Sequence, residues 1–166
     1  MPEVSWAVTD KGVKTISVRK LADGRTFRRV TEAVLPTLRI IPNPFVKDYG
    51  CPVESIGWVL PIDDTHFMIY TSARVREKGE WSRYRGNWEK STEEERRNSP
   101  GDYEAQVGQG PITLHNEEHL GATDKGVIML RRLFQAQLDA VANGRDPVGL
   151  TLDETLIDFE AGNFIE

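Results

Sequence analysis

Apolar and polar residues alternate along much of the chain between residues 5 and 72, and a period of two is typical of strands half buried in a sheet. Turn signals separate these segments. Asp23-Gly24 predicts a type I′ hairpin turn, and Asp63-Asp64 predicts a second turn. We therefore expect antiparallel strands at residues 5–9, 13–20, 26–34, 55–62 and 66–72.

Prolines interrupt the region between the third and fourth of these strands. Residues 35–41 are flanked by Pro36 and Pro42, which predicts an edge strand or an extended connection. Residues 42–52 hold three prolines and a glycine, and this composition predicts a loop.

The last third of the chain changes period and predicts helices. Thr92-x-x-Glu95 and Ser99-x-x-Asp102 have the spacing of capping boxes, and Pro100 stands at the favoured first position of a helix. A long helix is expected over residues 124–142, before the C-cap signal Asn143-Gly144. Its apolar stripe consists of Val127, Leu130, Phe134, Leu138 and Val141.

These elements predict a single α+β domain over residues 1–166, in which an antiparallel sheet packs on a long C-terminal helix. This is the pattern of a helix-grip fold, which encloses a pocket between helix and sheet. The expected parts are strands at 5–72, a charged loop at 76–98, a helical part at 99–142 and an acidic tail at 148–166.

The charged loop carries seven Lys or Arg residues and six Glu residues, with Trp81, Tyr84 and Trp88 interleaved. Basic residues mixed with aromatic ones can bind nucleic acid. Here the charges nearly cancel, so a solvated loop or lid is the favoured interpretation. The net charge of -5 also argues against nucleic-acid binding, which depends on basic surface.

Composition places the chain among globular proteins. Its 166 residues are 39% hydrophobic and 28% charged, and no apolar run approaches the roughly 20 residues of a spanning helix. The N-terminus lacks the pattern of a signal peptide, so we expect a cytoplasmic protein without a membrane association. Cys51 is the one cysteine, which excludes a multi-cysteine metal site formed by these residues alone.

Few side chains are candidates for chemistry. His115 and His119 are four residues apart and would share a helix face, but Asn116 stands where a zinc-protease motif has its glutamate, and surface or packing roles are favoured. His66 is favoured as a half-buried strand residue. Asp102 is explained most simply as part of a capping box. No residue is assigned a catalytic role.

The region 101–133 resembles the oxygenase component of Rieske-type aromatic-ring hydroxylating enzymes, of the phthalate 4,5-dioxygenase-like branch that includes aromatic O-demethylases. The upstream sequence from Trp58 to His66 is similar to the Trp-x-x-Pro-x-Asp-Asp-Thr-His strand and turn of that branch. The elements in 101–133 that carry the resemblance are Asp102, Gln106, Gly110-Pro111-Ile112, Glu118-His119-Leu120, Asp124, Val127-Ile128 and Arg131-Arg132-Leu133. The resemblance covers nearly the whole chain, which corresponds to the C-terminal part of the catalytic domain.

The resemblance implies that Asp102 is the carboxylate of a 2-His-1-carboxylate site for mononuclear Fe(II). It implies a substrate pocket to which Trp58, His66, Met68 and Gln106 are candidates to contribute. The parent enzyme would activate O₂ to hydroxylate or O-demethylate an aromatic, often carboxylated, small molecule. Electrons would come through a reductase or ferredoxin and a [2Fe-2S] cluster, in a homo-oligomer that is expected to be a trimer.

Two parts of the implied enzyme have no counterpart in this sequence. A Rieske cluster needs two cysteines and two histidines, and the family's His-x4-His iron ligands lie upstream of the matching region. We therefore expect an incomplete helix-grip domain without the Rieske domain, as from a truncated or split gene. The alternatives are a non-catalytic helix-grip module that binds a small molecule in an apolar pocket, and an inactive fragment.

Overall fold

The computed structural model describes residues 2–42, 55–73, 91–148, 150 and 159–166. The chain divides into two compact units. The first holds nearly all of a sheet and the long helix α4 (Lys125–Ala142), and the second holds the turn Pro61–Phe67 with the short helices α2 (Glu93–Asn98) and α3 (Asp102–Gly108). The assignment of residues 1–166 to one domain stays a prediction.

Seven strands form one sheet in the first unit, and six of them follow the order of the chain. Each of the pairs β1–β2, β2–β3, β3–β4 and β4–β5 is antiparallel, which confirms the α+β fold class predicted from alternation. The strands are β1 (Glu3–Val8), β2 (Gly12–Lys20), β3 (Thr26–Val34), β4 (Leu38–Ile40), β5 (Ser55–Pro61), β6 (Phe67–Ala73) and β7 (Gly162–Ile165).

β3 is the centre of the sheet because three other strands pair with it. β2 runs along its full length, from Gly12 opposite Val34 to Lys20 opposite Thr26. β7 pairs with the first half of β3 and β4 with the second half. The buried residues Val34, Ile40 and Ala161 meet at this junction and form the core cluster, against which Leu38 and Phe159 pack.

Two of these strands correct the sequence predictions. The segment 35–41 was expected to be an edge strand or a connection, but β4 lies inside the sheet between β3 and β5. No strand was predicted in the acidic tail at 148–166, but β7 pairs with β3 from Gly162 opposite Val30 to Ile165 opposite Phe27. Both strands are too short for their alternation to stand out in the sequence.

The turn at Asp23-Gly24 also differs from its prediction. Gly24 has a φ of 88°, but no non-glycine residue in the described part of the chain has a positive φ, so a type I′ turn is excluded. Instead, the backbone N–H of Leu21 donates to the carbonyl oxygen of Arg25 at 2.9 Å. This closes a longer loop in which the glycine alone supplies the left-handed conformation.

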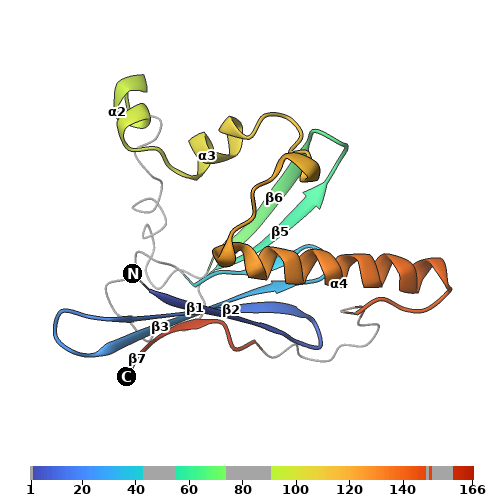
Figure 1. The fold of residues 1–166 in the computed structure, drawn as a ribbon, viewed down its shortest axis with the longest axis horizontal. Helices are drawn as coiled ribbons and strands as arrows, with labels where there is room; N and C mark the ends of the chain where they lie inside the picture. The colour runs from blue at the N-terminus through green and yellow to red at the C-terminus, as the bar shows by residue number, and fades with distance from the viewer. Residues whose placement is uncertain (1, 43–54, 74–90, 149, 151–158) are drawn as a thin grey trace. The chain divides into compact units, whose positions relative to one another are not determined.

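The long helix α4 confirms the helix predicted at 124–142, and it packs on β1 and β2 (Figure 1). Gly126 allows the helix to lie close to β1, because a Cβ at this position would collide with the indole ring of Trp6. Ala140 is the buried residue of the helix. In contrast, the predicted apolar stripe is largely exposed, at 42% for Val127, 37% for Phe134, 62% for Leu138 and 56% for Val141.

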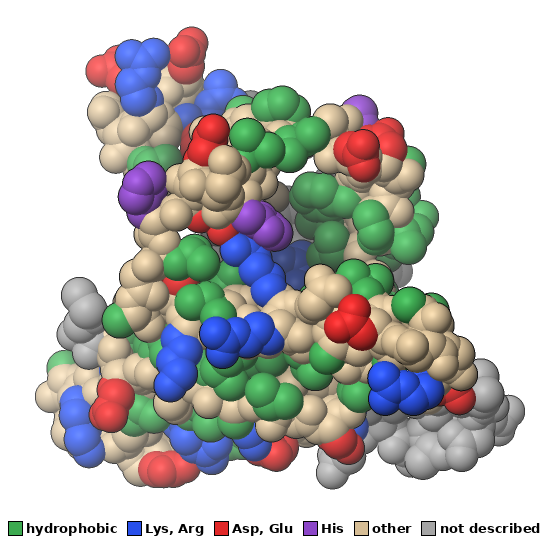
Figure 2. Space-filling view, turned by 45° about the vertical axis from the view of Figure 1, so that its right-hand side comes forward, with side chains coloured by type: hydrophobic (Ala, Val, Ile, Leu, Met, Phe, Trp, Pro, Cys, Tyr) green, Lys and Arg blue, Asp and Glu red, His purple; other side chains and the backbone are tan. Residues whose placement is uncertain are grey.

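Four of the five residues of the predicted stripe are therefore exposed, whereas Ala140, outside the stripe, is buried. Many other large apolar side chains also lie on the surface, as the green side chains in Figure 2 show. Among the described residues, no helix combines the length and hydrophobicity needed to cross a membrane.

In the second unit, α2 begins as the sequence predicts. The Thr92 hydroxyl accepts from the Glu95 backbone N–H at 3.2 Å, and the Glu95 carboxylate accepts from the Thr92 N–H at 2.8 Å. The charged loop predicted at 76–98 therefore ends in a helix, and its residues 76–90 lie outside the described part of the chain. Cys51 lies outside it as well.

Candidate functional site

Asp102 is the first residue of α3, directly after the N-cap Gly101. The capping box predicted for Ser99 and Asp102 is therefore wrong, since Ser99 is the C-cap residue of α2. Glu104 performs that role instead, because its carboxylate accepts from the Gly101 backbone N–H at 2.9 Å. The signal for this hydrogen bond, an acidic residue three positions after Gly101, was available in the sequence.

Trp58 and Met68 lie in the hairpin formed by β5 and β6. The backbone N–H of Ile62 donates to the carbonyl of His66 at 2.9 Å and closes this hairpin. Antiparallel pairing outward from this bond places Leu60 opposite Met68 and Trp58 opposite Tyr70, all on one face. This face is open, with Trp58 41% and Met68 45% exposed.

His66 belongs to the turn of the second unit and is held by Asp63. Asp63 Oδ1 accepts from the backbone N–H groups of Thr65 and His66, each at 2.8 Å, and lies 2.9 Å from His66 Nδ1. The hydrogen bond from the Thr65 backbone, followed by that of the His66 side chain, lowers the pKa of the Asp63 carboxyl. The predicted half-buried histidine is in fact exposed, because its side chain has 72% of its surface accessible.

Gln106 lies in α3 and is exposed. Trp58 and Met68 belong to the first unit, and His66 and Gln106 belong to the second. The structure brings Trp58 and Met68 onto one hairpin face. A shared substrate pocket for all four residues stays a prediction.

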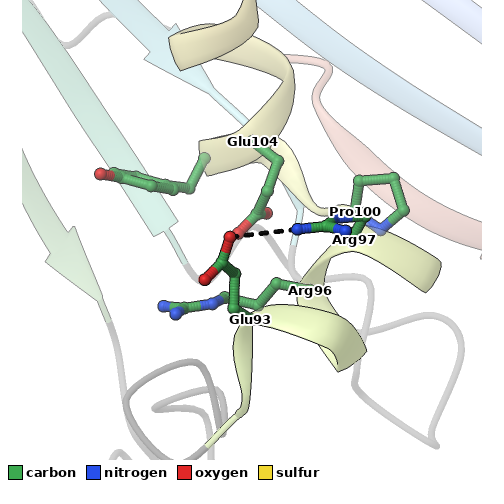
Figure 3. Close-up of a pocket in the computed structure, with 6 residues that line it drawn as sticks. Glu93, Arg96, Arg97, Pro100 and Glu104 are labelled. Atoms are coloured by element: carbon green, nitrogen blue, oxygen red, sulfur yellow. Dashed lines mark hydrogen bonds and ion pairs between the residues drawn. The ribbon is translucent and has the colours of Figure 1, made fainter.

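A pocket of about 540 Å³ lies between α2 and α3 in the second unit (Figure 3). Arg97 Nη2 donates to Glu93 Oε1 at 3.1 Å across its rim. Two arginines and two glutamates balance in charge there, so the pocket selects neither anions nor cations by its net charge. It contains none of the four pocket candidates, since its lining consists of Glu93, Arg96, Arg97, Pro100, Tyr103 and Glu104.

His115 and His119 do not share an α-helical face. His115 begins a single 3-10 turn, His115–Glu117, and Glu118 after it is extended with φ -75° and ψ 141°. A spacing of four residues places two side chains on one face of an α-helix, but it does not do so in this conformation. Among the described residues, no three His, Cys, Asp or Glu side chains come together as a group that could hold a metal ion.

The known proteins to which this chain is similar are oxygenase subunits. The chain is 36% identical over 172 residues to the alpha subunit of phenoxybenzoate dioxygenase from Ectopseudomonas oleovorans, covering 99% of this chain and 41% of the relative. It is 31% identical to the oxygenase subunit of tert-butanol monooxygenase / tert-amyl alcohol desaturase from Aquincola tertiaricarbonis, covering 89% of the chain and 34% of the relative. No protein-family model matches the chain.

A third relative is the oxygenase subunit of 5,5'-dehydrodivanillate O-demethylase from Sphingobium, 36% identical over 55 residues. That match covers 33% of this chain and 13% of the relative. All three relatives are oxygenase subunits, and the region of this chain that matches them has an α+β fold with a sheet and a long helix. Their similarity to this chain confirms the resemblance to Rieske-type oxygenases that the sequence indicated, and the chain spans about two fifths of the first relative's length.

Proposed function

We propose that this chain contributes the carboxylate ligand of a mononuclear iron site in a Rieske-type oxygenase, and that this ligand is Asp102. The larger enzyme would hydroxylate or O-demethylate its substrate with O₂. Its electrons would come from a reductase or ferredoxin through a [2Fe-2S] cluster that lies outside the matching region.

The observation that carries this proposal is the start of α3. The competing explanation of Asp102 required Ser99 as an N-cap, and Ser99 instead ends α2. Glu104 is the carboxylate that binds the N-cap backbone at Gly101. A capping box with Ser99 as its N-cap therefore does not account for Asp102, and the ordered motif from Asp102 to Leu133 supports a role as ligand.

The donor set limits what this chain does by itself. Iron held by two histidines and one carboxylate keeps coordination positions open for dioxygen. The described residues contain no group of three such donors, so they do not form a complete triad. In this proposal Asp102 supplies one ligand, and the two histidines come from the remainder of the oxygenase subunit.

The proposed substrate is an aromatic carboxylate. The relative with 36% identity over nearly the whole chain is named for phenoxybenzoate, whereas the relative with 31% identity is named for two aliphatic alcohols. On the protein side, the face with Trp58 and Met68 offers an aromatic and a polarisable apolar surface suited to an aromatic ring.

The test is co-expression of the chain with a polypeptide that carries the rest of the Ectopseudomonas oleovorans alpha subunit. We expect Asp102→Asn to lose mononuclear iron and turnover of phenoxybenzoate, because an amide replaces the anionic donor. The electron paramagnetic resonance signal of the Rieske cluster should persist. The experiment measures iron content, turnover and that signal on the same preparation.

Glu104→Gln is the matched control, since it alters a carboxylate in the same helix that has a capping role. We expect it to retain iron while lowering stability slightly. If Asp102→Asn binds iron as the unsubstituted chain does, Asp102 is not a ligand and the proposal fails.

A further inference from the structure

The C-terminal end of α4 carries the one Asn-Gly pair of the sequence, Asn143-Gly144. Both residues are exposed, and Gly144 has a φ of 69°. An asparagine that precedes glycine is chemically labile, because glycine has no side chain to keep its backbone nitrogen away from the carboxamide carbon of the asparagine. The sequence therefore places a reactive pair where the helix ends.

Two backbone hydrogen bonds hold the residues that follow the helix. The N–H of Gly144 donates to the carbonyl of Val141 at 3.0 Å, and the N–H of Arg145 donates to the carbonyl of Ala140 at 2.9 Å. With Asn143 as the C-cap, these two bonds form a Schellman motif, in which the glycine takes the left-handed conformation. The nitrogen that would attack the asparagine side chain is thus engaged in a hydrogen bond.

The side chain of Asn143 is held as well. Its Nδ2 donates to the backbone carbonyl of Asp139 at 2.7 Å, and the same carbonyl accepts from the Asn143 backbone N–H at 3.2 Å. Both reacting groups, the carboxamide of Asn143 and the N–H of Gly144, are therefore bound to carbonyl groups of the last turn of α4. A reaction between them requires this end of the helix to open first.

We propose that Asn143 is a site of spontaneous deamidation, and that the Schellman motif at the end of α4 controls its rate. The Gly144 nitrogen gives its proton to hydroxide and forms a bond to Cγ of Asn143. The Cγ–Nδ2 bond then breaks, and the leaving nitrogen takes a proton from water and departs as ammonia. Water opens the resulting succinimide ring at either carbonyl, which leaves aspartate or isoaspartate.

The product opposes re-formation of the helix end. A carboxylate has no Nδ2 donor for the Asp139 carbonyl, and it adds negative charge at a helix C-terminus, where the helix dipole is already negative. Isoaspartate also places an additional methylene in the backbone, which moves Gly144 away from the carbonyl of Val141. Each deamidation event therefore leaves the end of α4 less ordered than before.

The test follows the full chain in buffer and in guanidinium chloride at the same neutral pH, with mass spectrometry measuring the conversion of amide to acid at Asn143. We expect conversion in buffer to be at least about tenfold slower than in the unfolded chain, because local opening of the helix must precede it. Equal rates would show that the motif does not control the reaction. No conversion in guanidinium chloride would show that Asn143 is not a deamidation site.

Arg145→Pro removes the N–H that bonds to Ala140 and leaves the Asn-Gly pair intact. We expect it to deamidate faster than the unsubstituted chain in buffer and at the same rate in guanidinium chloride, with faster hydrogen exchange of the Gly144 amide. Arg145→Ala is the matched control, because it keeps that N–H and should retain the slow rate. Circular dichroism verifies that both variants fold. Equal rates for folded Arg145→Pro and Arg145→Ala in buffer overturn the control by the motif.

Discussion

Glu32 joins the C-terminal segment to the sheet through backbone hydrogen bonds. It is 7% exposed, and its Oε1 accepts from the N–H groups of Glu160 and Ala161 at 2.6 and 2.8 Å. These bonds form where β4 and β7 meet beside β3, next to the buried Ala161. A side chain therefore provides the acceptor for the two amides just before β7 begins.

We expect Glu32→Ala to destabilise the fold by about 1–3 kcal/mol, because two N–H groups lose their acceptor and one of them is buried. Glu32→Gln should cost less, since its amide oxygen keeps the shape and an acceptor. Urea unfolding measures both variants. Glu160→Gln is the control, because its carboxylate bonds to Lys14 at 2.7 Å from an exposed position. An equal loss for Glu32→Ala and Glu160→Gln would contradict this role of Glu32.

Gly126 is the residue that lets α4 approach β1. In an exposed helix, replacing glycine by alanine stabilises by up to about 1 kcal/mol. Here we expect Gly126→Ala to destabilise by about 1–3 kcal/mol, because the added methyl group collides with Trp6. Thermal unfolding measures the change, with Gly108→Ala as the control, since nothing lies within 4 Å of a Cβ at that position.

A double-mutant cycle makes the cause of that loss testable. When Trp6→Val accompanies Gly126→Ala, the penalty of the alanine should largely disappear because the smaller side chain leaves room. A penalty that persists without the indole would assign the effect to another cause. The sequence indicated the helix but not this contact, since the pairing of Gly126 with Trp6 arises from packing between distant segments.

At the scale of elements, the turn between β5 and β6 is the feature that sequence reasoning described best. Asp63 was expected as a turn residue, and its carboxylate does accept the two backbone N–H groups of Thr65 and His66. These hydrogen bonds favour the charged form and lower the pKa of Asp63 below its ordinary value of 3.8.

This lowered pKa gives the turn a defined pH dependence. Its contribution to stability is fully present above pH 3.8 and is lost as the pH falls through the lowered pKa. In an NMR titration, we expect the amide signals of Thr65 and His66 to shift together with a midpoint below 3.8. Asp63→Asn should abolish that shift. A midpoint at or above 3.8 would show that the carboxylate does not hold the turn.

Strands and helices with a long run of periodic residues were predicted at the right positions. The short strands β4 and β7 were not. Strands β2, β3 and β5 and helix α4 lie where periodicity predicts them. β4 was expected at an edge or in a connection and not inside the sheet, and β7 was missed, because three or four residues show no clear period. For α4, periodicity located the helix, but four of the five residues of its predicted apolar stripe are exposed.

At the scale of the whole molecule, the candidate site depends on information that this sequence does not contain. The family resemblance indicated Asp102 as a ligand, whereas the local pattern alone favoured a capping box with Ser99, and the N-cap of α3 is instead Gly101. The pocket candidates are divided between the two units, and their assembly into one pocket stays a prediction. Ligands contributed by distant segments leave no periodic signal in any one segment.

The last prediction concerns metal binding by the chain on its own. We expect Fe(II) to bind weakly or without detectable heat in anaerobic calorimetry, because in our proposal Asp102 supplies one of the three donors of a facial triad. His115 and His119 should not compensate, since a 3-10 turn followed by an extended residue separates them. His115→Ala and His119→Ala are therefore expected to leave the titration unchanged. Tight one-to-one binding that either substitution abolishes would show that these histidines are ligands, and that the iron site is built within this chain.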